Sequence, residues 1–157
     1  IIRGEDWDLA QRIKKTGGLV WFSPELRVTY WPRGRFSNLV KQFYSTGIWR
    51  GDLTRRDVRG ASTRYFAPPV LVLGLVAGLA LLGFGNILGI LPWAAYSAAI
   101  LALAVSASGL SLKSRVALMI ALPTMHLSWG VGFIKGALVG AGTTIDQGRL
   151  SRKAAGK

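Results

Sequence analysis

The hydrophobic and polar positions divide the chain into a mixed first part and an apolar second part. The apolar part opens with 48 residues, 65–112, that carry no charged side chain. As a single helix this run would measure about 70 Å, more than twice the ~30 Å hydrocarbon core of a bilayer. Gly, Asn and Pro residues interrupt the Leu/Val/Ala pattern at 83–92, so we expect the chain to fold back there. The pattern predicts two membrane spans, at about 68–88 and 93–111. A buried hairpin of a soluble protein is the alternative, but it would need a polar face that neither segment has.

A third apolar segment is predicted to span the membrane at about 116–135. It lies between Arg115 and Lys135 and contains a proline and a histidine. Basic residues precede the first span and follow the second, so both ends of the hairpin favour the cytoplasm. A third crossing would place the basic tail, 141–157, on the opposite side, against that bias. Three spans are the prediction, and a partly re-entrant or interfacial third segment is the alternative.

Two features of the third segment suggest contacts between helices. The spacings Gly132–Gly136 and Gly136–Gly140 are typical of closely packed helices. His126 is a polar residue at membrane depth, where it either marks a functional cavity or makes a hydrogen bond between helices, to Ser128 or a backbone carbonyl.

Residues 1–64 have a different pattern, which predicts a small α/β unit. A helix capped by Asp6 or Asp8 is expected to end at the Gly17–Gly18 pair. Short strands are predicted at 19–22 and 27–30, joined by a Ser-Pro turn. Apolar residues then recur at helical spacing from Phe36 to Ile48, as in an amphipathic helix lying against the bilayer or the domain. The fold class predicted is therefore mixed: a partial α/β unit followed by an α-helical transmembrane region. A unit this small buries little core alone, so we expect a preceding part of a longer protein to complete it.

Composition narrows the functional classes. A formal charge of +13 accompanies a mean hydropathy of +0.35, which favours a membrane protein whose flanks meet anionic lipid. Nucleic acid is the rival partner, but residues 67–157 carry basic side chains only at the edges of apolar stretches, so no nucleic-acid partner is expected. The chain has no cysteine and one histidine, which excludes disulfides, thiolate sites and a His-rich metal centre.

The most informative motif pairs two acids with a short amphipathic pattern near the start of the chain. It reads Gly4-Glu5-Asp6-Trp7-Asp8-Leu9-Ala10-Gln11-Arg12-Ile13, and further short motifs follow at residues 15–18, 20–22, 24–28, 42–50, 67–69 and 123–130. The first motif resembles the Glu-Asp motif of family 2 glycosyltransferases. The later ones resemble the C-terminal region of succinoglycan-biosynthesis-type membrane glycosyltransferases. The resemblance covers nearly the whole chain, and the order of the motifs makes it specific.

The resemblance implies a separate role for each part of the chain. Residues 1–64 would be the acceptor-side end of a GT-A-like catalytic domain, residues 65–140 the transmembrane helices and residues 141–157 a basic tail. An inverting glycosyl transfer needs a carboxylate that takes the proton of the attacking hydroxyl. By the resemblance Asp6 is that base, and Glu5 orients Asp6 or the acceptor. From the residues alone, both acids can instead be first-turn helix acids without a catalytic role.

Four further residues are candidates for binding the acceptor: Trp7, Gln42, Trp49 and Arg50. Trp7 is either a sugar platform or part of a core. Processive relatives carry a Gln-x-x-Arg-Trp motif, whereas here Gln42 is followed later by the reversed pair Trp49-Arg50. Trp49 could stack on a sugar or lipid, or anchor the chain at the interface. Arg50 could approach a diphosphate, or bind anionic lipid.

The resemblance also implies partners for the full-length protein. These are a nucleotide-sugar donor, a lipid-linked or glycan acceptor and membrane lipids, at the inner cell membrane with the catalytic part cytoplasmic. A divalent cation, Mg²⁺ or Mn²⁺, is expected there, but the Asp-x-Asp motif that would bind it is not upstream of the Glu-Asp motif in this chain. Asp6-Trp7-Asp8 matches the Asp-x-Asp pattern, but its place in the Glu-Asp motif argues against a metal-ligand role. We therefore expect this fragment alone to be inactive. The alternative function is a non-catalytic membrane scaffold or subunit with a basic juxtamembrane domain.

Overall fold

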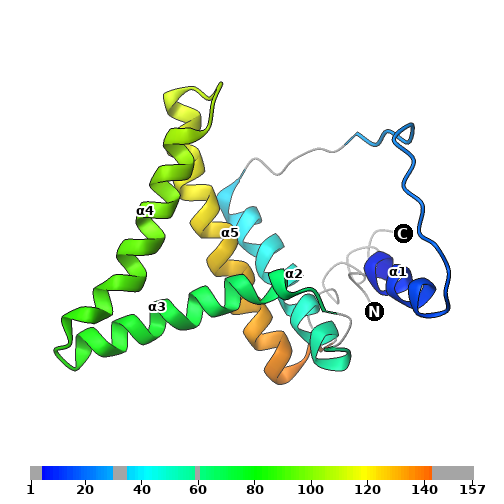
Figure 1. Cartoon of the computed structure of the whole chain (residues 1–157), viewed down its shortest axis with the longest axis horizontal. Coiled ribbons are helices and arrows are strands. Elements are labelled where there is room, and N and C mark those ends of the chain that lie inside the picture. Colours follow the sequence, from blue (N-terminus) through cyan, green and yellow to red (C-terminus); the bar gives the residue numbers. More distant parts are fainter. Residues whose placement is uncertain (1–4, 30–34, 59–60, 143–157) are drawn as a thin grey trace, which may run out of the picture.

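The structure is a computed structural model that describes residues 5–29, 35–58 and 61–142, with Glu5 and Trp7 described by their backbone only. The described residues form α-helices and short 3₁₀ helices (Figure 1). In chain order these are α1 (Glu5–Lys15), α2 (Phe36–Arg56), η1 (Thr63–Phe66), α3 (Ala67–Gly83), η2 (Ile87–Ile90), α4 (Leu91–Ser106) and α5 (Leu112–Val139).

The predicted α/β unit is not found, because the described part of residues 1–64 contains no strand. Residues 19–22 and the described part of 27–30 are irregular, and Leu19, Trp21 and Phe22 are more than four-fifths exposed. A strand is stable only when its backbone hydrogen bonds and apolar face are paired. No neighbouring strand is present among the described residues to do so. The helix predicted between Asp6 and Gly17 is formed, as α1, and Gly17 follows it with a φ of +81°.

Three described helices are long and apolar enough to cross a membrane, as predicted. With their flanking 3₁₀ turns they cover Thr63–Gly83, Ile87–Ser106 and Leu112–Val139. The first two lie about five residues earlier than the sequence suggested. The reason is the role of Pro92, which was expected to belong to the turn between the helices. Pro92 instead lies in the first turn of α4, where the missing N–H of proline breaks no helical hydrogen bond.

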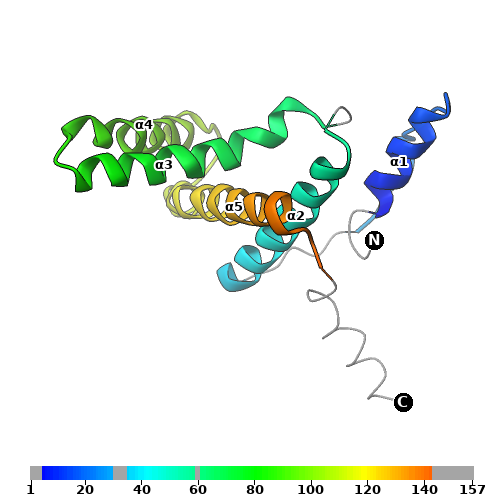
Figure 2. The ribbon, with the colours of Figure 1, turned by 90° about the horizontal axis from the view of Figure 1, so that it is seen from below.

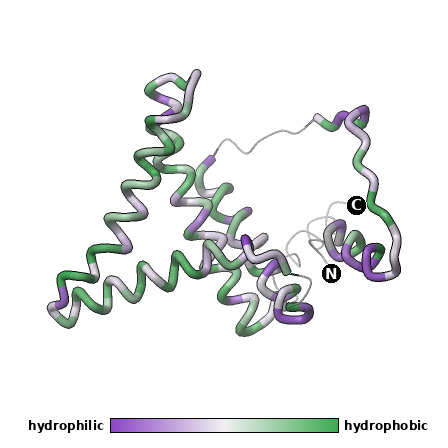
Figure 3. Tube along the Cα trace, viewed as in Figure 1, coloured by the Kyte–Doolittle hydropathy of each residue, from purple (hydrophilic) through white to green (hydrophobic). Residues whose placement is uncertain are grey.

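The helices α3 and α4 form a hairpin whose connecting residues, 84–90, include no charged side chain. Both arms are mostly hydrophobic along their length, and a short hydrophilic patch lies at the tip (Figure 3). At the tip, Asn86 caps η2 by accepting a hydrogen bond from Leu88 N at 3.0 Å. The two helices approach closely at Gly78, where an added Cβ would lie 2.6 Å from the carbonyl oxygen of Gly89. Trp93 Nε1 donates to the carbonyl of Leu75 at 3.1 Å and fastens α4 to α3.

The helix α5 packs antiparallel to α4 along its first half. Arg115 Nη1 donates to the carbonyl of Ala104 at 2.9 Å, and Tyr96 Oη lies 3.0 Å from His126 Nδ1. The hydrogen bond between helices predicted for His126 is therefore present, but its partner is Tyr96 rather than Ser128. Tyr96 also lines a cavity of about 170 Å³ between α4 and α5.

The second half of α5 packs backbone to backbone against α2. Glycines on both helices make this possible: a Cβ at Gly132 would lie 2.2 Å from the carbonyl oxygen of Tyr44, and one at Gly136 would lie 1.9 Å from that of Ile48. On α2, a Cβ at Gly47 would meet the Trp129 carbonyl oxygen at 2.2 Å. The close packing predicted from the Gly132–Gly136 spacing is confirmed. Gly140 lies just beyond the end of α5, with a φ of +86°.

The arrangement of α3, α4 and α5 resembles the three sides of a triangle, with α2 alongside the C-terminal half of α5 (Figure 1). Seen from below, α2 crosses next to the end of α5, and α1 is separate from the triangle (Figure 2). The amphipathic helix predicted at Phe36–Ile48 is thus the start of a longer helix that packs on the protein itself.

Candidate functional site

The first turn of α1 carries the predicted catalytic pair. Asp6 is exposed on this turn, and the backbone of Glu5 begins the helix. A carboxylate in a first helical turn is stabilised by the unpaired N–H groups there. The Asp6 side chain is thus accessible to solvent at the N-terminal end of α1.

The far end of α1 faces the end of α2. Lys15 Nζ forms an ion pair with Asp57 Oδ2, and Arg12 Nε pairs with Asp8 Oδ2 at 3.1 Å on α1 itself. A pocket of about 120 Å³ lies between the two helices, lined in part by Leu53. Its other lining residues are the charged or polar Asp8, Gln11, Arg12, Lys15, Arg56 and Asp57.

Arg50, a predicted acceptor-binding residue on α2, lies against Tyr65 and near the charge of Asp6. Its guanidinium carbon lies 4.5 Å from the centre of the Tyr65 ring, as in a cation–π contact. Burial lowers the pKa of Arg50, and the charges of Tyr65 and Asp6 act in the opposite direction. The charge of Asp6, on α1, thus acts on Arg50, on α2.

Trp49 and Gln42 have different surroundings. Trp49 is only 7% exposed and packs with Ile48, Tyr44 and Ala141, so its ring is part of the contact between α2 and the end of α5. Its Nε1 has no hydrogen-bond partner among the described residues. Gln42 is half-buried on the preceding part of α2. Acceptor-binding roles for these residues, and for Trp7, whose side chain lies outside the described part, stay predictions.

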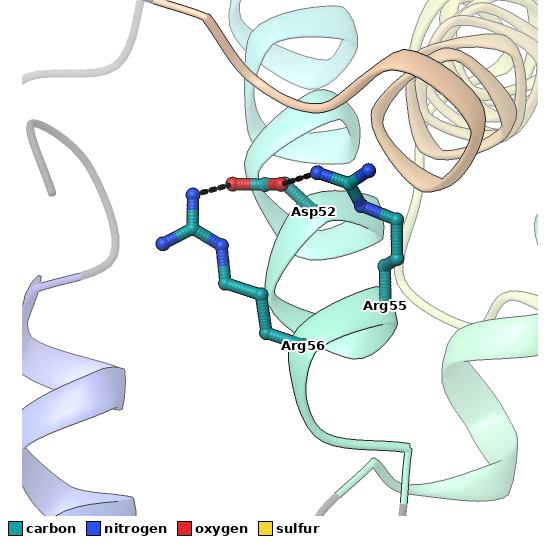
Figure 4. Close-up of polar contacts among 3 residues, drawn as sticks. All are labelled: Asp52, Arg55 and Arg56. Carbon is teal, nitrogen blue, oxygen red and sulfur yellow. Dashed lines mark hydrogen bonds and ion pairs between the residues drawn. The ribbon is translucent and has the colours of Figure 1, made fainter.

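A buried carboxylate on α2 was missed by the sequence analysis. Asp52 is 0% exposed, and its two oxygens accept from Arg55 Nη2 at 3.1 Å and Arg56 Nη2 at 2.6 Å (Figure 4). The cluster lies beside the end of α5, since a Cβ on Gly140 would be 3.3 Å from Asp52 Oδ1. The available signal was an acid followed by arginines three and four residues later, the spacing of ion pairs on one helix face.

The Asp52 cluster holds two arginines at the polar end of the molecule. Both side chains are about half exposed, at 50% for Arg55 and 58% for Arg56. A buried carboxylate fixes one edge of each guanidinium and leaves the other edges as donors to solvent or to an anion. The end of α2 is therefore a rigid cationic surface. Within the described residues, no group of three or more His, Asp or Glu side chains could hold a metal ion.

The fold and these surfaces define the class first: a helical protein with three helices apolar enough for a membrane, which points to a membrane protein with a cationic flank. A comparison with curated proteins then finds succinoglycan biosynthesis protein ExoA of Rhizobium meliloti (strain 1021), 28% identical over 130 residues. The match covers 82% of this chain and 39% of ExoA. No protein-family model matches the chain, and no solved structure matches it significantly. This chain therefore spans about two fifths of the length of this curated relative.

Proposed function

We propose that this chain is the C-terminal, membrane-binding part of an inverting glycosyltransferase of envelope or exopolysaccharide synthesis. The whole protein would transfer a sugar from a nucleotide-diphosphate sugar to a lipid-linked or polysaccharide acceptor at the cytoplasmic face of the inner membrane. The observation that carries the proposal is the similarity over 82% of this chain to ExoA, a protein named for succinoglycan biosynthesis. The Glu5-Asp6 motif and the apolar helices are the features of this chain that fit the proposal.

In the proposed reaction the acceptor hydroxyl attacks the anomeric carbon of the donor sugar, and the bond from that carbon to the nucleotide diphosphate breaks. Asp6 takes the hydroxyl proton as the new glycosidic bond forms. Its exposed place on the first turn of α1 supports this role, because an acceptor hydroxyl can reach the carboxylate there.

Arg50 is proposed to act beside Asp6. The charge of Asp6 acts on the Arg50 guanidinium, so the two side chains can face the same substrate. The same guanidinium suits the diphosphate that leaves, since arginine presents several donors in one plane. Binding of the donor and of its Mg²⁺ or Mn²⁺ ion is assigned to another part of the full-length protein.

The test is the transfer rate of the full-length protein with Asp6→Asn, and the matched control is Asp8→Asn. Both changes remove one carboxylate from α1, but Asp8 pairs with Arg12 and has no proposed chemistry. Loss of a general base lowers the rate by about 10²-fold or more, so Asp6→Asn should fall by that factor while Asp8→Asn stays within about twofold. Equal rates for the two variants would remove Asp6 from the chemistry.

A further inference from the structure

The contact between α2 and α5 fixes where the second half of α5 can lie relative to a membrane. Four glycines bring the two backbones together, and a Cβ at Gly51 would lie 2.1 Å from the carbonyl oxygen of Phe133. Lipid cannot enter such a contact, so the two helices share one environment. That environment is set by α2, which is the more polar of the two.

The helix α2 carries five charged residues, one near its start and four in its last seven positions. Lys41 is exposed near the start, and Arg50 precedes the Asp52–Arg55–Arg56 cluster that closes the helix. Charged side chains of this number are not found in contact with hydrocarbon. The helix α2, and with it α5 from Trp129 onward, therefore lies outside the hydrocarbon core.

The remaining part of α5 is too short to cross a bilayer. Between Arg115 and the α2 contact at Trp129 lie residues 116–128, and 13 helical residues measure about 20 Å. The hydrocarbon core is about 30 Å thick. The whole apolar stretch 116–134 crosses only if α2 enters the hydrocarbon with it.

The way α3 and α4 meet α5 points to the same placement. The start of α3 contacts α5 at Gly130, where an added Cβ would be 2.5 Å from the carbonyl oxygen of Pro68. The end of α4 contacts α5 at Arg115, through the carbonyl of Ala104. Three alternating spans would place the start of α3 at the level of Arg115. Instead, the contacts of α3 and of α4 with α5 lie about 15 residues, or roughly 22 Å, apart along α5.

We infer that α5 lies along one membrane surface beside α2, and that only the α3–α4 hairpin enters the hydrocarbon. The two helices form an interfacial pair whose partner is the headgroup layer of one leaflet. The charged residues then fall on one face of the membrane: Lys113 and Arg115 at one end of α5, and Lys135 near the other. The hairpin between them carries no charge, and the basic tail no longer opposes the charge bias.

Because the chain has no cysteine, single cysteines report the topology directly. We would introduce Thr63→Cys, Phe84→Cys, Ser108→Cys and Ser151→Cys one at a time in the full chain. Each would be labelled with a membrane-impermeant maleimide in spheroplasts and in inverted vesicles. Thr63, Phe84 and Ser108 are all exposed, so the changes leave the packing intact. An epitope tag after Lys157 gives a second reading of the C-terminal side.

The inference predicts that Thr63, Ser108 and Ser151 react from the same face and that Phe84 does not react from that face. Three alternating spans would place Ser151 with Phe84, opposite Ser108. If α3 lay on the surface and α4 and α5 crossed instead, Thr63, Phe84 and Ser151 would react from one face and Ser108 from the other. Labelling of Ser108 and Ser151 from opposite faces therefore overturns the inference. The labelling does not depend on catalysis, so it stands or falls separately from the proposed function.

Discussion

The glycine contact between α2 and α5 gives the most quantitative prediction, at Gly136. In Gly136→Ala the new Cβ would lie 1.9 Å from the Ile48 carbonyl oxygen and 2.7 Å from its carbon. An ordinary contact of about 3.4 Å would require the backbones to separate by roughly 1.5 Å, and gaps of 0.5–1 Å already forfeit a quarter to a half of a dispersion contact. Overpacking of this kind costs up to about 3 kcal/mol.

Alanine also favours a helix over glycine by about 1 kcal/mol. The net loss expected for Gly136→Ala is therefore about 2 kcal/mol in the free energy of unfolding. For a chain of this size that corresponds to a melting temperature lower by roughly 4–8 °C.

The matched control is Gly74→Ala in α3, where an added Cβ meets nothing within 4 Å. It keeps the gain in helix propensity without the clash, so its melting temperature should stay level or rise. The assay is thermal unfolding of the detergent-solubilised chain, followed by far-UV circular dichroism. If Gly136→Ala melts at or above the temperature of Gly74→Ala, the close α2–α5 contact is not present.

Three further changes test single contacts by the same unfolding assay. Asp52→Asn should cost about 1–3 kcal/mol, because a buried acceptor of two charged hydrogen bonds loses its charge. Trp93→Phe keeps an aromatic side chain, though a smaller one, and removes the hydrogen bond to Leu75 O, at a cost of at least about 1 kcal/mol. Tyr96→Phe leaves His126 Nδ1 without this partner and should cost about 0.6 kcal/mol, as found for hydrogen bonds between membrane helices.

Each control removes a polar group of the same kind from a more exposed position. Asp8→Asn removes an exposed ion pair of α1 and should change stability by less than about 0.5 kcal/mol. Ser97→Ala, on α4 next to Tyr96, removes an exposed hydroxyl and should be close to neutral. A loss in Asp52→Asn no larger than that in Asp8→Asn would show that the buried cluster does not stabilise the fold.

The length of the apolar segments was the sequence feature that predicted the structure best. The charge-free run with its Gly/Asn interruption predicted two long apolar helices, and the segment between Arg115 and Lys135 predicted the third. These predictions needed only composition and length, which decide whether a helix can be buried in lipid. Helix boundaries were less accurate, since Pro92 can break a helix or begin one, and only the position of the turn decides which.

The contacts between distant segments could not be read from the sequence. Strands at 19–22 and 27–30 were predicted from local apolar runs, but a strand forms only beside another strand, and local patterns do not supply the neighbour. Similarly, Gly47 and Gly51 on α2 carry the spacing of a packed helix. Their meaning depended on knowing that α5 was the partner.

The candidate site was predicted in part. The acids at the start of α1 were chosen for their motif, and Arg50 was chosen for its place after Trp49. Their electrostatic contact required the fold that brings α1 near α2. Asp52 was not chosen, because a single acid among arginines on a helix is usually a solvated ion pair, and its complete burial depends on the end of α5.

The most direct test of the central claim is sugar transfer by membranes that contain the wild-type, full-length protein. The membranes would be incubated with a panel of radiolabelled nucleotide sugars, and radioactivity would be measured in the lipid-extractable and polysaccharide fractions. Matched membranes without the protein are the control. The proposal predicts incorporation from one donor, in one of these fractions, well above the control. No incorporation from any donor would contradict it and would favour a non-catalytic scaffold.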